Sequence, residues 1–211
     1  MVGFDVAPEL SGTLSHDDIS GYVRVLVKQV NTIFGTSLPN IGIAWISPTE
    51  LGIYNSSYET IAYYAETDYN RNLGFPCVRL LLSRRIFIES HSGIAYVGSA
   101  CGPGIAAVFN VDPTIIRSGD YSGAWSRRND AALTAAHEIA HTYGIQHSQN
   151  KFDFMYAASV VSDMTLDFLP AMDLTCLTDD TVDIFPVACF GWTFLGVFIF
   201  ILVSKSGNFS V

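Results

Sequence analysis

Three histidines and one glutamate, gathered in a stretch of eleven residues, have the types and spacing needed for metal-dependent chemistry. The stretch covers residues 137–147, reads HEIAHTYGIQH, and holds three of the five histidines of the chain. Residues four apart on a helix lie one above the other, so His137 and His141 can ligate one ion. Gly144 is expected to end the helix with a positive φ, which glycine adopts without strain. The chain would then turn back and bring His147 to the same ion.

Zinc is the metal that this set of ligands favours. Neutral imidazoles suit Zn²⁺, which prefers four ligands in a tetrahedral arrangement. Three protein ligands leave the fourth position for water, as in catalytic zinc sites and unlike closed structural ones. The spacing therefore predicts one catalytic Zn²⁺ held by His137, His141 and His147.

Glu138 directly follows the first of these ligands, about 100° further round the helix. From there it can reach a zinc-bound water without ligating the metal. Zinc lowers the pKa of that water toward about 7, and Glu138 would accept its proton as a general base. The hydroxide would attack a carbonyl polarised by the same ion, and Glu138 would then pass the proton to the leaving amine. The predicted reaction is peptide-bond hydrolysis without a covalent intermediate.

A helix over residues 131–143 is expected to carry the first two ligands. Asn129 or Asp130 is a suitable N-cap for it. On a helical wheel its small apolar residues fall on one side and the two histidines on the other, so its back can pack against a sheet. These apolar positions are Ala132, Ala135, Ala136, Ile139 and Tyr143.

Short apolar runs elsewhere predict the strands of that sheet. They lie at 41–46, 77–82, 93–98 and 105–111. Residues 1–15 are expected to be an extended lead-in, and residues 113–128 a surface loop.

Further helices are expected elsewhere in the chain. One would begin at a cap formed by Asp17 or Asp18 and run to Phe34, where Gly35 ends it. A second is expected over 58–69. Residues 159–176 are expected to form one helix or, because a proline interrupts the pattern, two short helical pieces. The remaining histidines, His16 and His91, are expected to be ordinary surface or loop residues.

Length and composition favour one folded domain. A chain of 211 residues is long enough to bury a sizeable core, and 49% hydrophobic with 15% charged residues argues against disorder. The net charge of −9 argues against nucleic acid as a partner, because phosphate binding needs a basic surface. Four cysteines are too few for a disulfide scaffold. One or two bridges would fit a secreted or lumenal domain, and buried free thiols are the alternative.

Ile184–Val203 is an uncharged apolar run of the length that crosses a bilayer. Aspartates precede it and a lysine follows it, which by the positive-inside rule places the main domain outside the cytosol. We therefore expect a possible transmembrane helix over 184–203 and a short tail over 204–211, with a buried core helix as the alternative. The first residues show no secretory signal pattern. The expected location is nevertheless secreted or at the cell surface, with possible membrane anchoring.

The zinc-binding stretch and the residues after it resemble the metzincin metalloproteases, which share this extended motif and a downstream methionine turn. Met155, within FDFMYA at 152–157, matches that turn, and the resemblance implies that it forms a hydrophobic floor beneath the metal. GIAYVGSAC at 93–101 is similar to the edge strand of the adamalysins, or reprolysins, the disintegrin-and-metalloprotease type. The resemblance runs from about residue 17 to residue 177.

This resemblance implies an α/β (α+β, zincin-like) fold and a catalytic domain over residues 1–178. The fold would be a twisted mixed sheet of about five strands with a long active-site helix beneath it. Substrate would lie extended along the edge strand and pair with its backbone. A disulfide between Cys101 and Cys176 is also implied. The expected substrate-binding residues are Ile94, Ala95, Tyr96, Val97, Ala157 and Ala158.

Three interpretations of function remain open. The leading one is an adamalysin-like zinc endopeptidase that acts on extracellular or surface proteins and peptides. The second is a matrixin-like or other metzincin protease, because Ser148 and the eight-residue step from His147 to Met155 are similar to matrixins. The third is a zinc-stabilised binding or adhesion domain with little activity.

Overall fold

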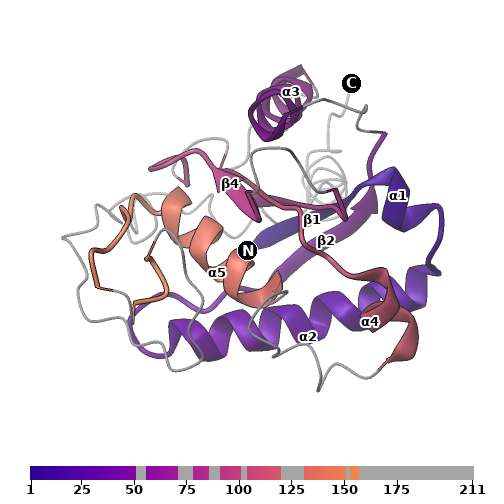
Figure 1. Ribbon diagram of the computed structural model, residues 1–211, viewed down its shortest axis with the longest axis horizontal. Coiled ribbons are helices and arrows are strands. Elements are labelled where there is room, and N and C mark those ends of the chain that lie inside the picture. Colours follow the sequence, from indigo (N-terminus) through magenta and orange to yellow (C-terminus); the bar gives the residue numbers. More distant parts are fainter. Residues whose placement is uncertain are drawn as a thin grey trace, which may run out of the picture.

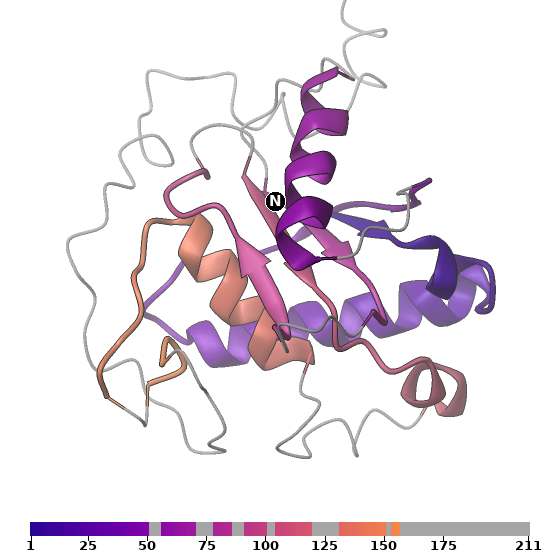
Figure 2. The ribbon, with the colours of Figure 1, turned by 45° about the horizontal axis from the view of Figure 1, so that its top comes forward.

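Five strands form one mixed sheet between helices in the described part of the chain (Figures 1 and 2). The computed structural model describes residues 1–50, 56–70, 78–85, 91–100, 104–119, 131–150 and 153–156. The strands lie in the order β2-β1-β3-β5-β4. They are β1 (Val2–Val6), β2 (Ile43–Pro48), β3 (Val78–Leu82), β4 (Gly93–Ala95) and β5 (Ile105–Val108).

The sheet is parallel except at one edge. β1 pairs in parallel with β2 and β3, and β3 pairs in parallel with β5. β4 runs antiparallel to β5 and forms the edge, with Ile94 opposite Ala107. A mixed five-stranded sheet with a helix carrying the histidines confirms the predicted fold class.

The first residues form β1, a fully buried interior strand, so the prediction of an extended lead-in was wrong for Val2–Val6. Gly3 leaves room for a neighbouring side chain, because a Cβ there would lie 2.1 Å from the Trp45 ring on β2. Asp5 pairs with Arg79 of β3. Glycine and aspartate are both depleted in strands, which explains why the local sequence gave no strand signal.

Helix α2 (His16–Phe34) begins one residue before the expected cap region. Ser15 is its N-cap: the Ser15 Oγ accepts from the Asp18 backbone N–H at 3.1 Å, and the Ser15 N–H donates to the Asp18 carboxylate at 3.3 Å. This reciprocal capping box satisfies two backbone donors, so the prediction of Asp17 or Asp18 as the cap was wrong. Gly35 ends the helix as expected, with φ of 55°.

Two short helices lie where none was expected. They are α1 (Pro8–Ser11) and α4 (Pro113–Ser118). Asp112 caps α4, since its side chain accepts from the Thr114 N–H at 2.8 Å, and Pro113 occupies the first helical position. Pro at this position costs no hydrogen bond. The loop prediction was therefore wrong for 113–118, and residues 120–128 lie outside the described part.

The helices cover both faces of the sheet. α2 and α5 (Ala131–Thr142) lie on one face, and α3 (Ser57–Asn70) lies on the other (Figures 1 and 2). The α5 boundary agrees with its prediction within one residue, and α3 agrees with the prediction of 58–69. Small residues let α5 pack closely between α2 and the sheet. Its core positions include Ala132, Ala135, Ala136, Ile139 and Ala140.

A buried ion pair between β1 and β3 provides the contact for α3 on the other face of the sheet. The Arg79 guanidinium donates to the Asp5 carboxylate, with Nε 2.8 Å from Oδ2. Tyr64 of α3 donates its hydroxyl to the same carboxylate at 2.5 Å, and the guanidinium lies 4.8 Å from the centre of the Tyr64 ring. A buried charge needs such partners to offset its desolvation. The cluster therefore fixes the position of α3 against β1 and β3.

One predicted strand differs from the structure, and three further predictions concern residues that the structure does not describe. β2 begins two residues later than the strand predicted over 41–46, and it is a half-buried edge strand. The predicted helix over 159–176, the predicted span Ile184–Val203 and the tail lie outside the described residues. Among the helices that are described, none has the length and apolar character to cross a bilayer.

Candidate active site

The C-terminal end of α5 positions two histidines and reverses the chain. The Gly144 N–H donates to the His141 carbonyl at 2.9 Å, and the Ile145 N–H donates to the Ala140 carbonyl at 3.2 Å. These two bonds form a Schellman motif, which requires a left-handed residue. Gly144 supplies it, with φ of 90°. The turn sends the chain back along the helix and brings His147 beside the two helical histidines.

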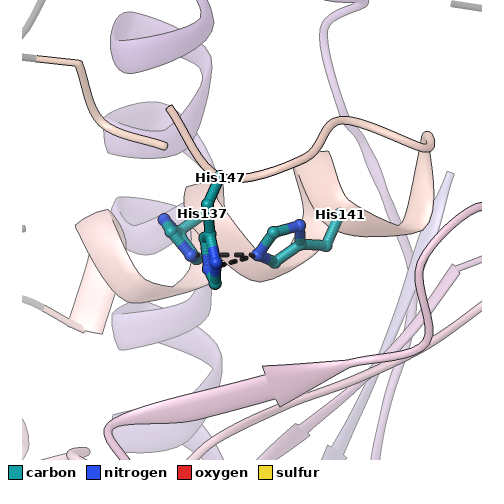
Figure 3. A group of neighbouring side chains, drawn as sticks. All are labelled: His137, His141 and His147. Atoms are coloured by element: carbon teal, nitrogen blue, oxygen red, sulfur yellow. Dashed lines mark hydrogen bonds between the residues drawn. The ribbon is translucent and has the colours of Figure 1, made fainter. Parts of the chain in front are cut away.

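The three imidazoles turn toward one another (Figure 3). The His141 Nε2 lies 3.1 Å from the Nε2 of His137 and 3.1 Å from the Nε2 of His147. One ligand nitrogen from each ring lies within 4.8 Å of the others. His137 and His141 are buried, whereas His147 is exposed. The structure thus brings together the three residues predicted to be ligands.

Backbone carbonyls determine which ring nitrogens face the centre. The His137 Nδ1 lies 2.7 Å from the Phe154 carbonyl oxygen, and the His141 Nδ1 lies 2.6 Å from the Ile145 carbonyl oxygen. A carbonyl oxygen only accepts, so each Nδ1 carries the hydrogen. In the neutral rings each Nε2 then presents a lone pair to the centre, as a metal ligand requires.

These distances fit a tetrahedral metal. Two imidazoles bound to zinc at about 2.0–2.1 Å, at tetrahedral angles, place their nitrogens roughly 3.3–3.4 Å apart. The observed spacing of 3.1 Å is close to that value. Lone pairs converging in this way repel one another unless a cation lies between them. The donor set therefore suits one Zn²⁺ with a fourth position left for another ligand.

Burial keeps the helical histidines neutral at ordinary pH. Desolvation lowers the pKa of His137 to about 4, outweighing the hydrogen bond that the ring donates to the Phe154 carbonyl, which acts in the opposite direction. Desolvation likewise lowers the pKa of His141. A proton therefore competes weakly with a metal ion for these two rings.

Glu138 lies on the side of α5 that faces β4, and its side chain is buried. Burial raises the pKa of its carboxyl to about 8. A cation nearby would favour the ionised form. The close approach of Gly93 to this carboxylate was not predicted from the sequence. A Cβ at Gly93 would lie 2.6 Å from the Glu138 Cγ, 2.8 Å from its Oε1 and 2.6 Å from the Thr134 Cγ2.

The expected substrate strand lies beside this helix. Ile94 and Ala95 are half-buried residues of β4, whereas Tyr96 and Val97 follow it and are 43% and 47% exposed. The continuation of β4 reaches the end of α5, where the Gly98 N–H donates to the His141 carbonyl at 2.9 Å. β4 therefore lies along α5, the helix that carries His137 and His141 (Figures 1 and 2).

Met155 is buried in the main core, and its carbonyl accepts from the Ser148 N–H at 2.9 Å. This bond ties the methionine turn to the residue after His147. Its role as a floor beneath the metal stays a prediction.

Other predicted positions lie elsewhere or outside the described part. Ala157, Ala158 and the proposed Cys101–Cys176 bridge lie outside it, as do the expected caps of α5 at 129 and 130. His16 is exposed on the first turn of α2. The His91 Nδ1 lies 3.0 Å from the Ser57 Oγ at the start of α3. Neither of these two histidines belongs to the cluster of three.

Comparisons with known proteins agree with this geometry. A family model described as Metallo-peptidase family M12B Reprolysin-like matches residues 21–148, which include the three histidines and Glu138. A comparison with curated proteins gives no match. A similar solved structure is metalloproteinase-II from Bacteroides fragilis, at 16% identity and a TM-score of 0.50, covering 83% of this chain and 52% of that chain. The chain thus spans about half the length of that metalloproteinase, and the likeness shows a shared fold.

Proposed function

Because the chain belongs to the reprolysin-like M12B family of zinc metallopeptidases, we propose that it hydrolyses peptide bonds as an endopeptidase. In this proposal His137, His141 and His147 hold one Zn²⁺, and Glu138 is the general base. The observation that carries it is the convergence of three Nε2 atoms, two of them from the helix that also carries the buried carboxyl of Glu138.

Each of these residues has a defined task. Zinc bound there supplies a Lewis acid that activates water and polarises the scissile carbonyl. The carbonyls of Phe154 and Ile145 hold His137 and His141 in the tautomer that binds a metal. Glu138 accepts a proton from the attacking water and delivers it to the leaving amine. Its position on α5, one residue after His137, keeps its carboxylate near the reacting atoms.

The substrate is proposed to be an extended protein or peptide segment that adds to the sheet at β4. Two features support this. β4 is an edge strand, and its start contacts the side chain of Glu138. Edge strands bind extended peptides through backbone hydrogen bonds. Ile94, Ala95, Tyr96 and Val97 would then contact the substrate, with Ala157 and Ala158 after the methionine turn.

A location outside the cytosol is proposed from the sequence pattern of the C-terminal apolar run and the residues that flank it. Anchoring through Ile184–Val203 and a Cys101–Cys176 bridge are part of the same proposal. An extracellular domain can form such a bridge, because that environment is oxidising.

The test compares the full chain with its Glu138→Gln variant, using a fluorescently labelled unfolded protein as substrate. Both proteins are expected to bind one zinc ion per chain. The wild type should cleave the substrate, and the variant should lose about 10²–10⁴-fold in kcat, as expected when a general base is removed. Glu59→Gln, a change on the first turn of α3, is the matched control and should cleave normally. Equal cleavage by wild type and Glu138→Gln would contradict the proposed role of Glu138.

The binding-domain alternative makes a different prediction. A zinc-stabilised adhesion domain would bind one zinc ion and leave the labelled substrate intact. The buried position of Glu138 argues against this alternative. Burying a carboxyl group costs stability, and a binding domain would gain nothing in return for that cost.

A further inference from the structure

Asp153 is a buried carboxylate that the proposed reaction does not use. Its side chain is 1% exposed. Its Oδ1 accepts from the Met155 N–H at 2.8 Å. Its backbone N–H donates to the Asn150 carbonyl at 3.1 Å, and its carbonyl accepts from the Tyr156 N–H at 3.0 Å. Backbone and side chain of Asp153 together therefore determine the conformation of residues 153–156.

One peptide group connects this carboxylate to a zinc ligand. The Met155 N–H and the Phe154 C=O belong to the same planar peptide unit, so fixing one fixes the direction of the other. Asp153 binds the N–H of this unit, and the His137 Nδ1 binds its C=O at 2.7 Å. The Asp153 carboxylate thus connects through the Phe154–Met155 peptide to the His137 ring, whose Nε2 faces the proposed metal position.

A hydrogen bond to the N–H of a peptide strengthens its carbonyl as an acceptor, because bonds in a chain polarise one another. A stronger acceptor at Nδ1 holds the ring in one tautomer and raises the basicity of Nε2. The same turn is also bonded to the residue after the third proposed ligand, since the Met155 carbonyl accepts from the Ser148 N–H.

We infer that Asp153 is a positioning residue for the zinc ligand His137 and acts through the Phe154–Met155 peptide. The inference rests on the proposed zinc site and assigns a task to a residue outside the HExxHxxGxxH stretch. Asp153 touches neither metal nor substrate in this scheme, so its effect is on metal affinity and coordination geometry.

The chain contains a matched control. The Asp112 Oδ1 accepts from the Thr114 N–H two residues later, also at 2.8 Å, at the start of α4. The two aspartates thus make the same local turn. The peptide oriented by Asp112 belongs to the first turn of α4, which lies at the right of Figure 1, whereas the chain that follows α5 lies at the left. A purely local role for Asp153 would make the two residues equivalent.

The experiment uses the full chain and three variants: Asp153→Ala, Asp153→Asn and Asp112→Ala. Zinc affinity is measured by competition with a coloured chelator, and the visible spectrum of the Co²⁺-loaded protein reports coordination geometry. Asp153→Ala is expected to weaken zinc binding about 10–100-fold, as for other partners of metal ligands, and to alter the Co²⁺ spectrum. Asp153→Asn keeps an acceptor oxygen and should recover most of the affinity. Asp112→Ala should bind zinc like the wild type.

Two results would overturn the inference. One is unchanged zinc affinity in Asp153→Ala. The other is a loss in Asp112→Ala or in Asp153→Asn as large as that in Asp153→Ala, which would mean that the acceptor at residue 153 has no special role. If Asp153→Ala fails to fold, Asp153→Asn decides, because its neutral amide oxygen is a weaker acceptor for the Met155 N–H than a carboxylate. Its zinc affinity should then fall measurably below that of the wild type and of Asp112→Ala, and equal affinity in all three proteins would overturn the inference. A wild type that binds no zinc would instead refute the proposed function itself.

Discussion

At the scale of single residues, the candidate site is defined by what holds each side chain in place. His137 and His141 each donate from Nδ1 to a backbone carbonyl, so their free nitrogens face inward. The Glu138 side chain is positioned by packing and not by a hydrogen bond to a carbonyl. It packs against a glycine of the edge strand, where any side chain would intrude.

Gly93→Ala tests that contact. The added Cβ would lie 2.6 Å from the Glu138 Cγ, and this carboxylate is buried, so it has little room to move away. A displacement of about 1 Å in a catalytic group can cost about 10²-fold. We expect kcat to fall about 10–100-fold while zinc stoichiometry stays at one per chain. Steady-state kinetics and metal analysis measure the two effects.

Gly42→Ala is the control for that substitution. Its Cβ would meet the Met1 side-chain sulfur, the far end of a flexible group, at 2.9 Å. Its kinetics should equal those of the wild type. Wild-type kcat in Gly93→Ala would show that the close approach does not position Glu138.

At the scale of elements, the end of α5 both stops the helix and orients a ligand. Gly144→Ala places a Cβ at φ of 90°, which costs roughly 1–2 kcal/mol of stability. The Ile145 carbonyl that binds His141 lies in the same turn, so zinc affinity should fall as well. Urea unfolding and chelator competition measure the two quantities.

Gly119→Ala separates backbone strain from ligand positioning. Gly119 ends α4 at φ of 64°, and a Cβ there meets nothing within 4 Å. It should lose similar stability and keep full zinc affinity. If both variants bind zinc equally well, the α5 turn has no role in the metal site.

Elements with local signals were predicted well from the sequence, and elements that depend on distant residues were not. α2 and α5 follow from amphipathic spacing and a terminal glycine, so their existence was predictable. β1 was not predicted, because the residues that make Gly3 and Asp5 suitable for a strand lie far along the chain. Trp45 packs over Gly3, and Arg79 pairs with Asp5. α4 did carry a signal, an N-cap aspartate followed by proline, within a stretch that otherwise resembled a loop.

The same distinction holds within the site. Ligand types and spacing are local, and His137, His141 and His147 could be named from them. The carbonyls that orient the rings, and the contact of Gly93 with Glu138, arise from tertiary packing. Every residue has the same backbone carbonyl, so the pattern of side chains does not predict which carbonyl will bind a histidine ring.

At the scale of the whole molecule, two buried clusters of the described residues support the sheet from opposite faces, and neither includes His137, His141 or His147. The fold should therefore survive without zinc. Zinc at a hundred times its Kd adds about 2.7 kcal/mol by mass action, which corresponds to a rise in Tm of about 5–10 °C for a domain of this size. Circular dichroism should show unchanged secondary structure after chelation and a lower Tm. Loss of secondary structure on chelation would contradict this view.

The buried ion pair on the α3 face is the second test of the framework. Arg79→Met leaves the Asp5 carboxylate buried without its cation, and removing one partner of such a pair costs about 3–5 kcal/mol. Urea unfolding of the zinc-loaded protein measures the loss. Arg24→Met, at an exposed position of α2, should change little. Equal stability of the two variants would show that the pair contributes nothing to the stability of this framework.

The most direct test of the central claim is X-ray absorption at the zinc edge of the zinc-loaded full chain. Three imidazole nitrogens at about 2.0–2.1 Å and one further light-atom ligand are predicted for a site made by His137, His141 and His147. The chain also contains four cysteines, which offer a competing donor set. A sulfur neighbour at about 2.3 Å, or fewer than three imidazoles, would contradict the account.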